Sequence, residues 1–302
     1  MFTQHKVADL LQLRYFQAVA HHQHVSRAAA ELHVAQPALS RSIARLETEL
    51  GVPLFDRHGR RVQLNRFGTM FLARVARAIG ELGQGQHELS DAAGLAQGTV
   101  AVAAETLRTL SGLVAGFLAG HPGVRFRLFQ SPAPAMAAQL QAGEVDLCLA
   151  SQPLPGPALA SIELLSEEVL LAVPPSHRLA GHTRATVSVR GAELAGEPFV
   201  TTRPGYWQRA LTDRIFTDAV IVCEGDEPYA IRGLISAGVG IGLMPAMARR
   251  LAPDPPVGWL HLDVPCRRTL SLVWRTDAYQ PAAARALTEF AAGYFRTWRG
   301  DA

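Results

Sequence analysis

The residues best suited to chemistry lie near the N-terminus, on one face of a predicted helix. Apolar residues recur there at spacings of three and four, which predicts the buried stripe of a helix that opens at Pro37 and ends at Gly51. The stripe consists of Leu39, Ile43, Leu46 and Leu50. The opposite face carries small, amide and guanidinium side chains, namely Gln36, Pro37, Ala38, Ser40, Arg41 and Arg45. Glutamine can bind adenine bidentately, arginine can bind guanine, and small groups fit against thymine methyls, so this face is suited to the major groove. The alternative is a polar face exposed to solvent.

A shorter predicted helix precedes this one and would hold it in place. Its apolar side consists of Val25, Ala28, Ala29 and Leu32. Ser26 and Arg27 lie near its start and are further candidates for DNA contacts. Two short helices joined by a tight turn are typical of a helix-turn-helix motif.

The segment after these helices predicts a small β-hairpin, or wing, over residues 53–64 with its tip at residues 58–60. Arg57, Arg60 and Arg61 crowd this tip, where they could bind phosphates or enter a narrow minor groove. We therefore expect residues 1–65 to form an all-α winged helix-turn-helix domain that binds DNA.

The charge distribution agrees with this expectation. Residues 1–90 contain 11 of the 29 Lys+Arg and 7 of the 26 Asp+Glu residues, which leaves 18 against 19 for the rest. A basic module beside a near-neutral body favours a polyanion as partner, although a solvated surface would have the same charges. The hydrophobic content of 48% and charged content of 18% exclude a wholly disordered chain.

The sequence also shows no targeting signal and no metal-binding motif. The first residues lack the pattern of a signal peptide, and no apolar run reaches the length of a membrane span. The three cysteines, Cys148, Cys223 and Cys266, have no metal-ligand or CxxC spacing. We expect a cytoplasmic protein that binds neither a membrane nor a metal.

Three stretches of the N-terminal module carry a family resemblance: LRYFQAVA, VSRAAAELHVAQPALSRSIARLE and ELGVPLFDRHGRRVQLN. They resemble the DNA-binding domain of LysR-type transcriptional regulators. The chain departs from the usual family pattern at Ala35, where a Ser or Thr is common, and at Asn65, where Thr is common. Asn65 can still cap the helix that follows.

That next helix is expected over residues 66–93 as a linker. Its apolar residues alternate at spacings of three and four and predict a coiled-coil seam that would pair two chains. The seam consists of Leu72, Val75, Ile79, Leu82 and Leu89. The alternative is a helix that packs on its own chain.

The remaining residues, 94–302, alternate short apolar runs with helical stretches, which predicts a parallel α/β sheet. We expect two lobes, one of about residues 94–162 and 267–302 and the other of about residues 163–266, with a hinged cleft between them. The stretches GEVDLCLAS, EEVLLAVPPSHRLA and LISAGVGIGLMP resemble the effector-binding domain of the same regulators, which is like the periplasmic binding proteins.

Ligands bind beyond the carboxyl ends of strands in such sheets, and this geometry selects the candidate effector-binding residues. They are Glu105, Thr106, Leu107, Ser131, Ser151, Thr201, Thr202, Arg203, Glu224 and Asp226. Hydroxyl groups suit a small polar effector, and Arg203 could hold a carboxylate or phosphate. Each of these residues could instead cap a loop.

An enzyme is the competing class. The sequence has no GxSxG, Walker or HExxH motif, and the glycine run 238–242 precedes a strand, unlike a dinucleotide fingerprint, so close packing is its expected role. Glu105 and Glu224 could face each other across the cleft as an acid–base pair, although recognition of a polar ligand needs the same residues and is more common. A periplasmic solute receptor conflicts with the DNA-binding module.

We therefore expect a transcriptional regulator that is not an enzyme and has no catalytic residue, cofactor or metal. The resemblance implies a homo-oligomer, dimer or tetramer, that binds promoter DNA, a small-molecule effector and RNA polymerase.

Overall fold

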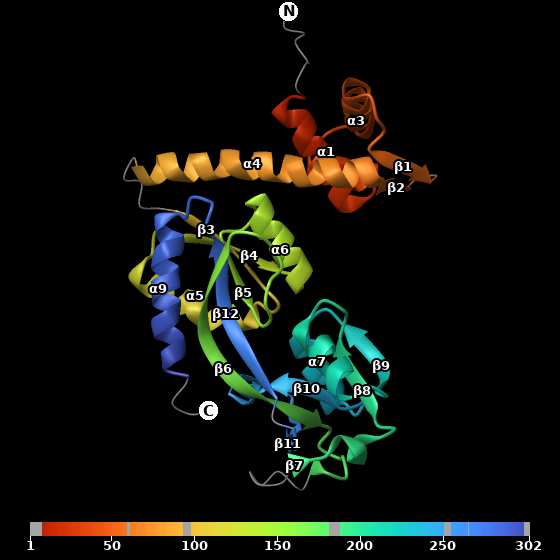
Figure 1. Cartoon of the computed structure of the whole chain (residues 1–302), viewed down its shortest axis with the longest axis vertical. Helices are drawn as coiled ribbons and strands as arrows, with labels where there is room; N and C mark the ends of the chain where they lie inside the picture. Colours follow the sequence, from red (N-terminus) through yellow and green to blue (C-terminus); the bar gives the residue numbers. More distant parts are fainter. Residues whose placement is uncertain are drawn as a thin grey trace, which may run out of the picture. The chain divides into compact units, whose positions relative to one another are not determined.

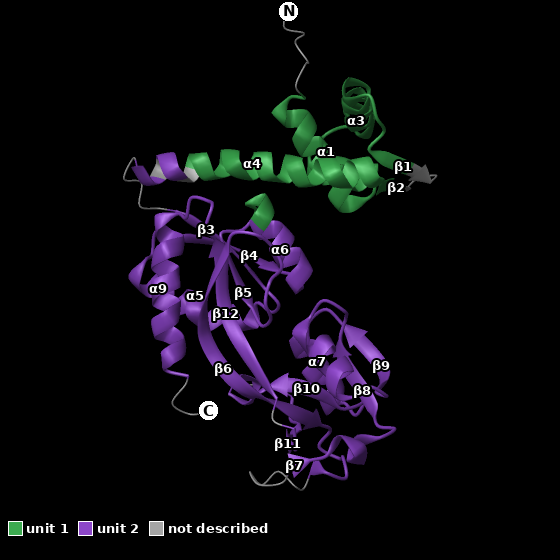
Figure 2. Cartoon of the chain, viewed as in Figure 1, with its two compact units in different colours: residues 1–87, 141–144 green, residues 88–140, 145–302 purple. Residues whose placement is uncertain are grey.

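The computed structural model describes residues 8–58, 61–92, 98–180, 188–250, 255–264 and 266–298. The chain forms two compact units, one of residues 1–87 with 141–144 and one of residues 88–140 with 145–302 (Figure 2). No helix within the described ranges is long and apolar enough to cross a membrane.

The first unit contains the predicted helices and hairpin (Figure 1). Its elements are α1 (Leu10–His22), α2 (Val25–Glu31), α3 (Gln36–Leu50), β1 (Phe55–His58), β2 (Arg61–Leu64) and most of α4 (Arg66–Ala92). Phe16, Leu39 and Leu46 are fully buried in its core. Asn65 caps α4 as predicted, because its Oδ1 accepts hydrogen bonds from the N–H groups of Phe67 and Gly68, both at 2.9 Å.

Helix α3 differs from its prediction at its first residue, which is Gln36 and not Pro37, and at Leu50. Gly51 ends the helix with φ 73°, a left-handed conformation that glycine adopts without strain. Leu50 was predicted within the buried stripe, and this was wrong, since its side chain is 38% exposed. It is the last residue of the helix and lies past the buried positions Leu39, Ile43 and Leu46.

The second unit is built on strands from two lobes. Its strands are β3 (Thr99–Ala104), β4 (Arg125–Gln130), β5 (Leu147–Ala150), β6 (Leu159–Val173), β7 (Ser188–Val189), β8 (Pro198–Thr202), β9 (Val220–Gly225), β10 (Gly242–Pro245), β11 (Gly258–Leu262) and β12 (Arg267–Arg275). Its helices are α5 (Arg108–Gly120), α6 (Ala133–Ala142), α7 (Trp207–Ile215), α8 (Pro228–Ser236) and α9 (Ala282–Arg296), with short 3₁₀ turns at Gly191–Leu194 and Ala246–Arg249.

We call lobe I the strands β3–β5 with α5, α6 and α9, and lobe II the strands β7–β11 with α7 and α8. The residues of β3 pack on α5 and α9 on one face and on α6 on the other. In lobe II, β8 and β10 pack on α7 on one face and on α8 on the other. β3 in lobe I and β8 and β10 in lobe II are therefore covered on both faces, whereas β4 and β9 keep exposed positions.

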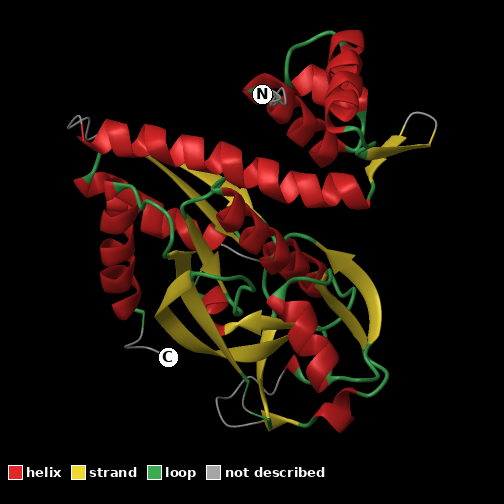
Figure 3. Ribbon diagram, turned by 45° about the horizontal axis from the view of Figure 1, so that its top comes forward, coloured by secondary structure: helices red, strands yellow, loops and turns green. Residues whose placement is uncertain are grey.

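The two lobes are joined by a pair of long strands, β6 and β12, which lie side by side in Figures 1 and 3. They pair antiparallel from Arg267↔Glu168 to Arg275↔Leu159. β12 also pairs with β5 of lobe I, whereas β6 also pairs with β10 and β11 of lobe II. Both β6 and β12 therefore run from one lobe to the other.

The prediction of a parallel sheet was wrong for part of the domain. β3 is parallel to β4 and β5, and β8 is parallel to β9, as expected. β10, β11 and β12 each run antiparallel to β6. A strand that returns directly from the other lobe, without a crossover helix, runs in the opposite direction.

The glycine run of residues 238–242 allows close packing, as expected. A Cβ atom on Gly240 would collide with the carbonyl oxygen of Pro198, and one on Gly242 with that of Val200. The N–H of Val200 donates to the Ile241 carbonyl at 2.8 Å, so this segment lies directly against β8.

Candidate DNA-binding surface and effector site

The predicted DNA-reading side chains share one surface of α3. Gln36, Pro37, Ala38, Arg41 and Arg45 are exposed, and Ser40 is half-buried. The side-chain amide of Gln36 donates to the Ser40 hydroxyl at 3.0 Å, and the Nε of Arg45 lies 2.8 Å from Oε1 of Glu49. Amide, hydroxyl and guanidinium groups are thus presented together from the first turns of the helix.

Buried residues on the other side fix the direction of this surface. Leu39, Ile43 and Leu46 anchor α3 in the core, and the tight turn before it has His33 at φ 52°. Ala35, the residue before α3, makes no side-chain capping hydrogen bond. The first N–H groups of a helix favour anions, so the uncapped start of α3 is suited to a phosphate.

The other predicted DNA contacts lie on α2 and the wing. Ser26 and Arg27 are exposed in the first turn of α2. The hairpin pairs Arg57 with Val62 and His58 with Arg61, so both arginines lie at its closed end. Arg60 lies outside the described residues.

The predicted seam of α4 divides into two parts. Val75 is buried, and Leu72 and Ile79 are partly buried against the core of the first unit. Leu82 and Leu89 are 55% and 72% exposed. The first three residues therefore pack on their own chain, which is the alternative considered above, and the last two are available to a partner.

The effector candidates of lobe I lie at the carboxyl ends of strands, as the pattern predicts. Glu105 and Thr106 follow β3, Ser131 follows β4, and Ser151 follows β5. Leu107 is half-buried just before α5.

Glu105 is 3% exposed and reaches lobe II, where its Oε1 accepts the N–H of Trp207 at 3.4 Å. The Thr106 hydroxyl donates to Oε1 of Glu227 at 3.5 Å. These residues define the lobe junction, where Glu105 and Thr106 of lobe I meet the first residues of α7 and α8.

The effector candidates of lobe II lie partly within strands and partly in exposed loops. Thr201 and Thr202 are the last residues of β8, so placing them after the strand was wrong, because the hydrogen bonds with β9 continue to Gly225. Both are buried, and the Thr202 hydroxyl has no hydrogen-bonding partner among the described residues. Arg203 pairs with Asp226, and both are exposed.

The alternative of an acid–base pair between Glu105 and Glu224 gains no support from their hydrogen bonds and ion pairs. Glu224 lies in β9 and pairs with Arg209, whereas Glu105 accepts from the start of α7. The two carboxyl groups therefore have separate partners. Within the described ranges there is no group of three or more His, Cys, Asp or Glu side chains that could hold a metal ion.

Sequence reasoning missed a buried ion pair beside Glu105. Nη2 of Arg268 lies 2.6 Å from Oε1 of Glu167, and its Nη1 donates to the Ser151 hydroxyl at 3.3 Å. The Trp207 ring covers the guanidinium, whose carbon lies 5.1 Å from the ring centroid. The available signal was a run of acidic residues in one strand, Glu167 and Glu168, and of basic residues in another, Arg267 and Arg268. The antiparallel pairing Arg268↔Glu167 would have been needed to use it.

The electrostatics of this network centre on Glu105. Burial raises the pKa of Glu105, and the Ser151 hydroxyl, the Arg268 charge and the Trp207 N–H oppose that rise. One of its oxygens, Oε2, is buried without a hydrogen-bonding partner among the described residues. The carboxyl group is therefore only partly satisfied.

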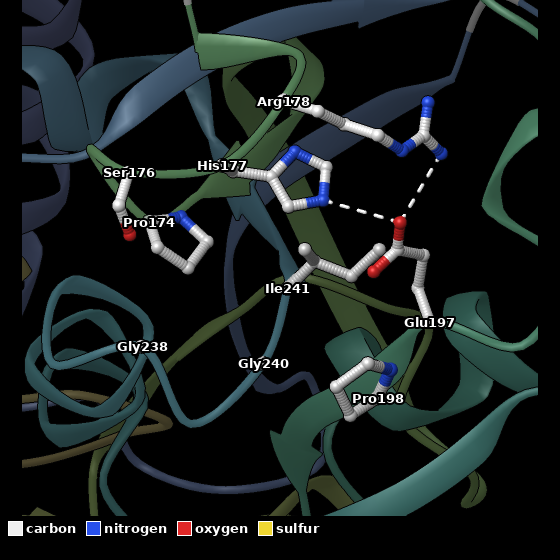
Figure 4. Close-up of a pocket in the computed structure, with 9 residues that line it drawn as sticks. All are labelled: Pro174, Ser176, His177, Arg178, Glu197, Pro198, Gly238, Gly240 and Ile241. Carbon is white, nitrogen blue, oxygen red and sulfur yellow. Dashed lines mark hydrogen bonds and ion pairs between the residues drawn. The ribbon is translucent and has the colours of Figure 1, made fainter.

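A separate pocket lies in lobe II at the amino end of β8 (Figure 4). Its lining residues are Pro174, Ser176, His177, Arg178, Glu197, Pro198, Gly238, Gly240 and Ile241. His177 and Arg178 both face Oε1 of Glu197, at 3.3 and 3.1 Å. None of the predicted effector residues lines it.

Comparison with known proteins agrees with both parts of the chain. Residues 10–69 match the family described as bacterial regulatory helix-turn-helix protein, lysR family, and residues 93–296 match the LysR substrate binding domain.

Curated relatives match over nearly the whole chain. The uncharacterized HTH-type transcriptional regulator YybE of Bacillus subtilis is 35% identical over 292 residues, covering 94% of this chain and 98% of that one. The RuBisCO operon transcriptional regulator of Allochromatium vinosum is 31% identical, covering 93% and 95%.

Solved structures support the fold. The LysR family transcriptional regulator CbnR is 22% identical, with a TM-score of 0.66 and coverage of 94% of this chain and 98% of that one. Full-length CbnR in complex with its target DNA has a TM-score of 0.64, 22% identity and the same coverage. A winged helix-turn-helix unit, a linker helix and a two-lobed α/β domain thus occur together, and the chain belongs to the LysR family of DNA-binding transcriptional regulators, with a substrate-binding effector domain.

Proposed function

We propose that this regulator reads a specific promoter site through the exposed face of α3, with phosphate contacts from α2 and the wing. The observation that carries this proposal is the grouping of Gln36, Ser40 and Arg41 on one exposed surface above a buried stripe. Arg41 has no partner among the described residues, so its guanidinium is free for a base or phosphate. Residues 1–65 would form this DNA-binding domain and residues 66–93 the linker.

A small molecule bound between the lobes would control DNA binding. Glu105 and Thr106 of lobe I reach the start of α7 and α8 in lobe II, so a ligand placed there would touch both lobes. A ligand that prefers one arrangement of the lobes shifts the equilibrium toward it, and by linkage it shifts DNA binding as well.

The functional species would be a homo-oligomer, a dimer or a tetramer. Leu82 and Leu89 expose apolar side chains on α4, and burying them against a second copy would remove this surface from water. Two copies would place two α3 helices on a two-fold symmetric site.

The relatives are named as transcriptional regulators, so we propose regulation without catalysis. On the promoter the protein would contact RNA polymerase, and it would act in the cytoplasm, where bacterial promoters are.

Selection of genomic DNA fragments by the purified full-length protein tests this proposal. We expect the bound fragments to share one sequence motif, and Arg41→Ala to weaken enrichment of that motif. Arg74→Ala, an exposed arginine of α4 outside the helix-turn-helix, is the matched control and should retain it. Fragments without a shared motif would contradict sequence-specific binding.

A further inference from the structure

The lobe junction holds more carboxylate than guanidinium groups. Tyr206, the residue before α7, is buried, and the charged side chains around it act on the pKa of its hydroxyl. Burial raises the pKa of the Tyr206 hydroxyl, the carboxylates of Asp226, Glu105 and Glu227 raise it further, and Arg203 lowers it. The carboxylates of Asp226, Glu105 and Glu227 therefore act on this phenol against the charge of Arg203.

The donors that would bind an anionic ligand here are already occupied. The first N–H of α7, on Trp207, donates to Glu105, and the N–H of Ala230 in α8 donates to Oε2 of Glu227 at 2.6 Å. A carboxylate of the protein thus takes the place of an anion at both helix starts.

The arginines near the junction have partners as well. Arg203 pairs with Asp226, Arg268 pairs with Glu167, and the Arg108 guanidinium lies over the Tyr229 ring, 4.6 Å from its centroid. An incoming anion would have to displace one of these partners and would meet the negative charge of the carboxylates.

Buried acceptor atoms, by contrast, lack partners. Oε2 of Glu105 and the side-chain oxygen of Gln208, the next residue after Trp207, are buried with no hydrogen-bonding partner among the described residues. Glu105 is only 3% exposed, so its Oε2 is shielded from bulk water. A bound ligand could supply the hydrogen-bond donor that this buried oxygen lacks. An ammonium or guanidinium group supplies several N–H donors and a positive charge.

We propose that the effector is a small organic cation, an amine or a guanidine, whose N–H groups bind Glu105 and whose charge is balanced by Asp226 and Glu227. This inference rests on the proposed function, because it names the chemical class of ligand for the same lobe junction. The phenol of Tyr206 adds an aromatic ring beside the acidic groups, which also favours a cation.

A matched series of probes tests the class of ligand. Straight-chain monoamines, diamines and alkylguanidines of two to six carbons are compared with mono- and dicarboxylates of the same lengths, using isothermal titration calorimetry and thermal unfolding of the full-length protein. We expect at least one cation to bind, to raise the unfolding temperature and to change the affinity for the selected DNA motif, and the carboxylates to do none of these.

Variants locate the binding at the junction. Glu105→Gln should lower the affinity for the bound cation at least tenfold, and Asp226→Asn should lower it as well. Because Asp226 is exposed, its variant keeps the test valid if Glu105→Gln does not fold. Glu289→Gln, an exposed position on α9, is the control and should bind like the wild type.

Three results would overturn the inference: binding of carboxylates in place of cations, no binding by any cation of the series, or cation binding that both variants leave unchanged. A protein that selects a DNA motif and responds to carboxylates would keep the proposed function and lose only this inference. A protein that selects no motif would lose the proposed function, whatever it binds at the junction.

Discussion

Arg41 and Glu105 are the two residues on which the proposed function most depends, and their surroundings are opposite. Arg41 is exposed on α3 without a partner among the described residues, so removing its side chain should leave the fold intact. Glu105 is buried at the lobe junction with one oxygen unsatisfied, so changing it should alter stability as well as binding. Arg41 is therefore tested by DNA affinity, and Glu105 by the dependence of stability on pH.

Arg41→Ala should weaken binding to the specific DNA site by about 1–3 kcal/mol, since a bidentate contact to guanine contributes about that much discrimination. Affinity for random duplex should change little, and the unfolding temperature should stay the same. Binding titrations on both duplexes measure this difference. Equal losses on the two would reassign Arg41 to the phosphates.

Glu105→Gln should change how stability depends on pH. Burial raises the pKa of Glu105, so the folded chain holds this proton more tightly than the unfolded chain does. Its contribution to stability is then greatest below the unfolded-state pKa and declines as pH rises through the raised folded-state pKa.

We expect the unfolding temperature of Glu105→Gln, relative to wild type, to increase as pH rises above about 4.3 and to level off above the raised pKa. Thermal unfolding of both proteins across this range measures it. A difference in unfolding temperature that does not vary with pH would show that folding does not raise the pKa of this carboxyl group.

At the scale of elements, three packing arrangements support the proposed DNA-binding surface, homo-oligomer and effector domain. They are the buried stripe of α3, the α4 helix with its buried and exposed apolar residues, and the close contact of residues 238–242 with β8. Gly240 and Gly242 lie so close to β8 that a Cβ atom on either would meet its carbonyl oxygens. α4 packs through Val75 on the first unit and exposes Leu82 and Leu89. Each of these arrangements can be tested by one or two substitutions.

Gly240→Ala should destabilise the protein by about 1–3 kcal/mol, because the added methyl group forces β8 and this segment apart. Gly233→Ala in α8 is a matched control, since nothing lies within 4 Å of its added Cβ. The control should stabilise the helix by about 0.5–1 kcal/mol. Denaturant unfolding compares the two, and equal effects would contradict the close packing.

Leu82→Gln combined with Leu89→Gln should weaken the homo-oligomer and leave the unfolding of each unit unchanged, because both side chains are exposed in the single chain. Val75→Ala is the contrasting variant and should lower the free energy of unfolding by about 1–3 kcal/mol. Sedimentation equilibrium over a range of concentrations measures the assembly. An unaltered association constant in the double variant would remove these residues from the interface.

Local patterns were sufficient to predict the DNA-binding unit. The spacing of Leu39, Ile43 and Leu46 fixes which face of α3 is buried, and Asn65 and Gly51 mark the helix ends they were expected to mark. The prediction for Leu50 was wrong because this residue continues the apolar periodicity but is the last residue of the helix, past the buried positions.

The effector site depends on contacts that are distant in sequence. Glu105 meets Trp207 and Glu167 meets Arg268, about a hundred positions away in each case. Strand pairing across the lobes is set by the tertiary fold, and an expected parallel sheet would not bring Arg268 beside Glu167. Thr201 and Thr202 were placed after β8 because strand ends are poorly marked in sequence.

At the scale of the whole molecule, the proposed function requires a connection from the proposed effector site at the lobe junction to the DNA-binding unit. Within the second unit the last turn of α4 is attached to lobe I, because Oδ2 of Asp91 accepts from the Tyr279 hydroxyl and the Ala282 N–H, both at 2.7 Å. The strands β6 and β12 join lobe I to lobe II. The lobe junction is therefore connected through the paired strands and lobe I to the end of the linker helix.

The central claim is that this chain binds a specific DNA site through α3. Fluorescence anisotropy of the full-length protein titrated onto duplex DNA carrying its selected motif, with a shuffled duplex as control and salt varied, tests it most directly. We predict binding that is at least about a thousandfold tighter on the motif than on the shuffled duplex and that weakens steeply as salt rises. Equal affinity for both duplexes at every salt concentration would contradict the account.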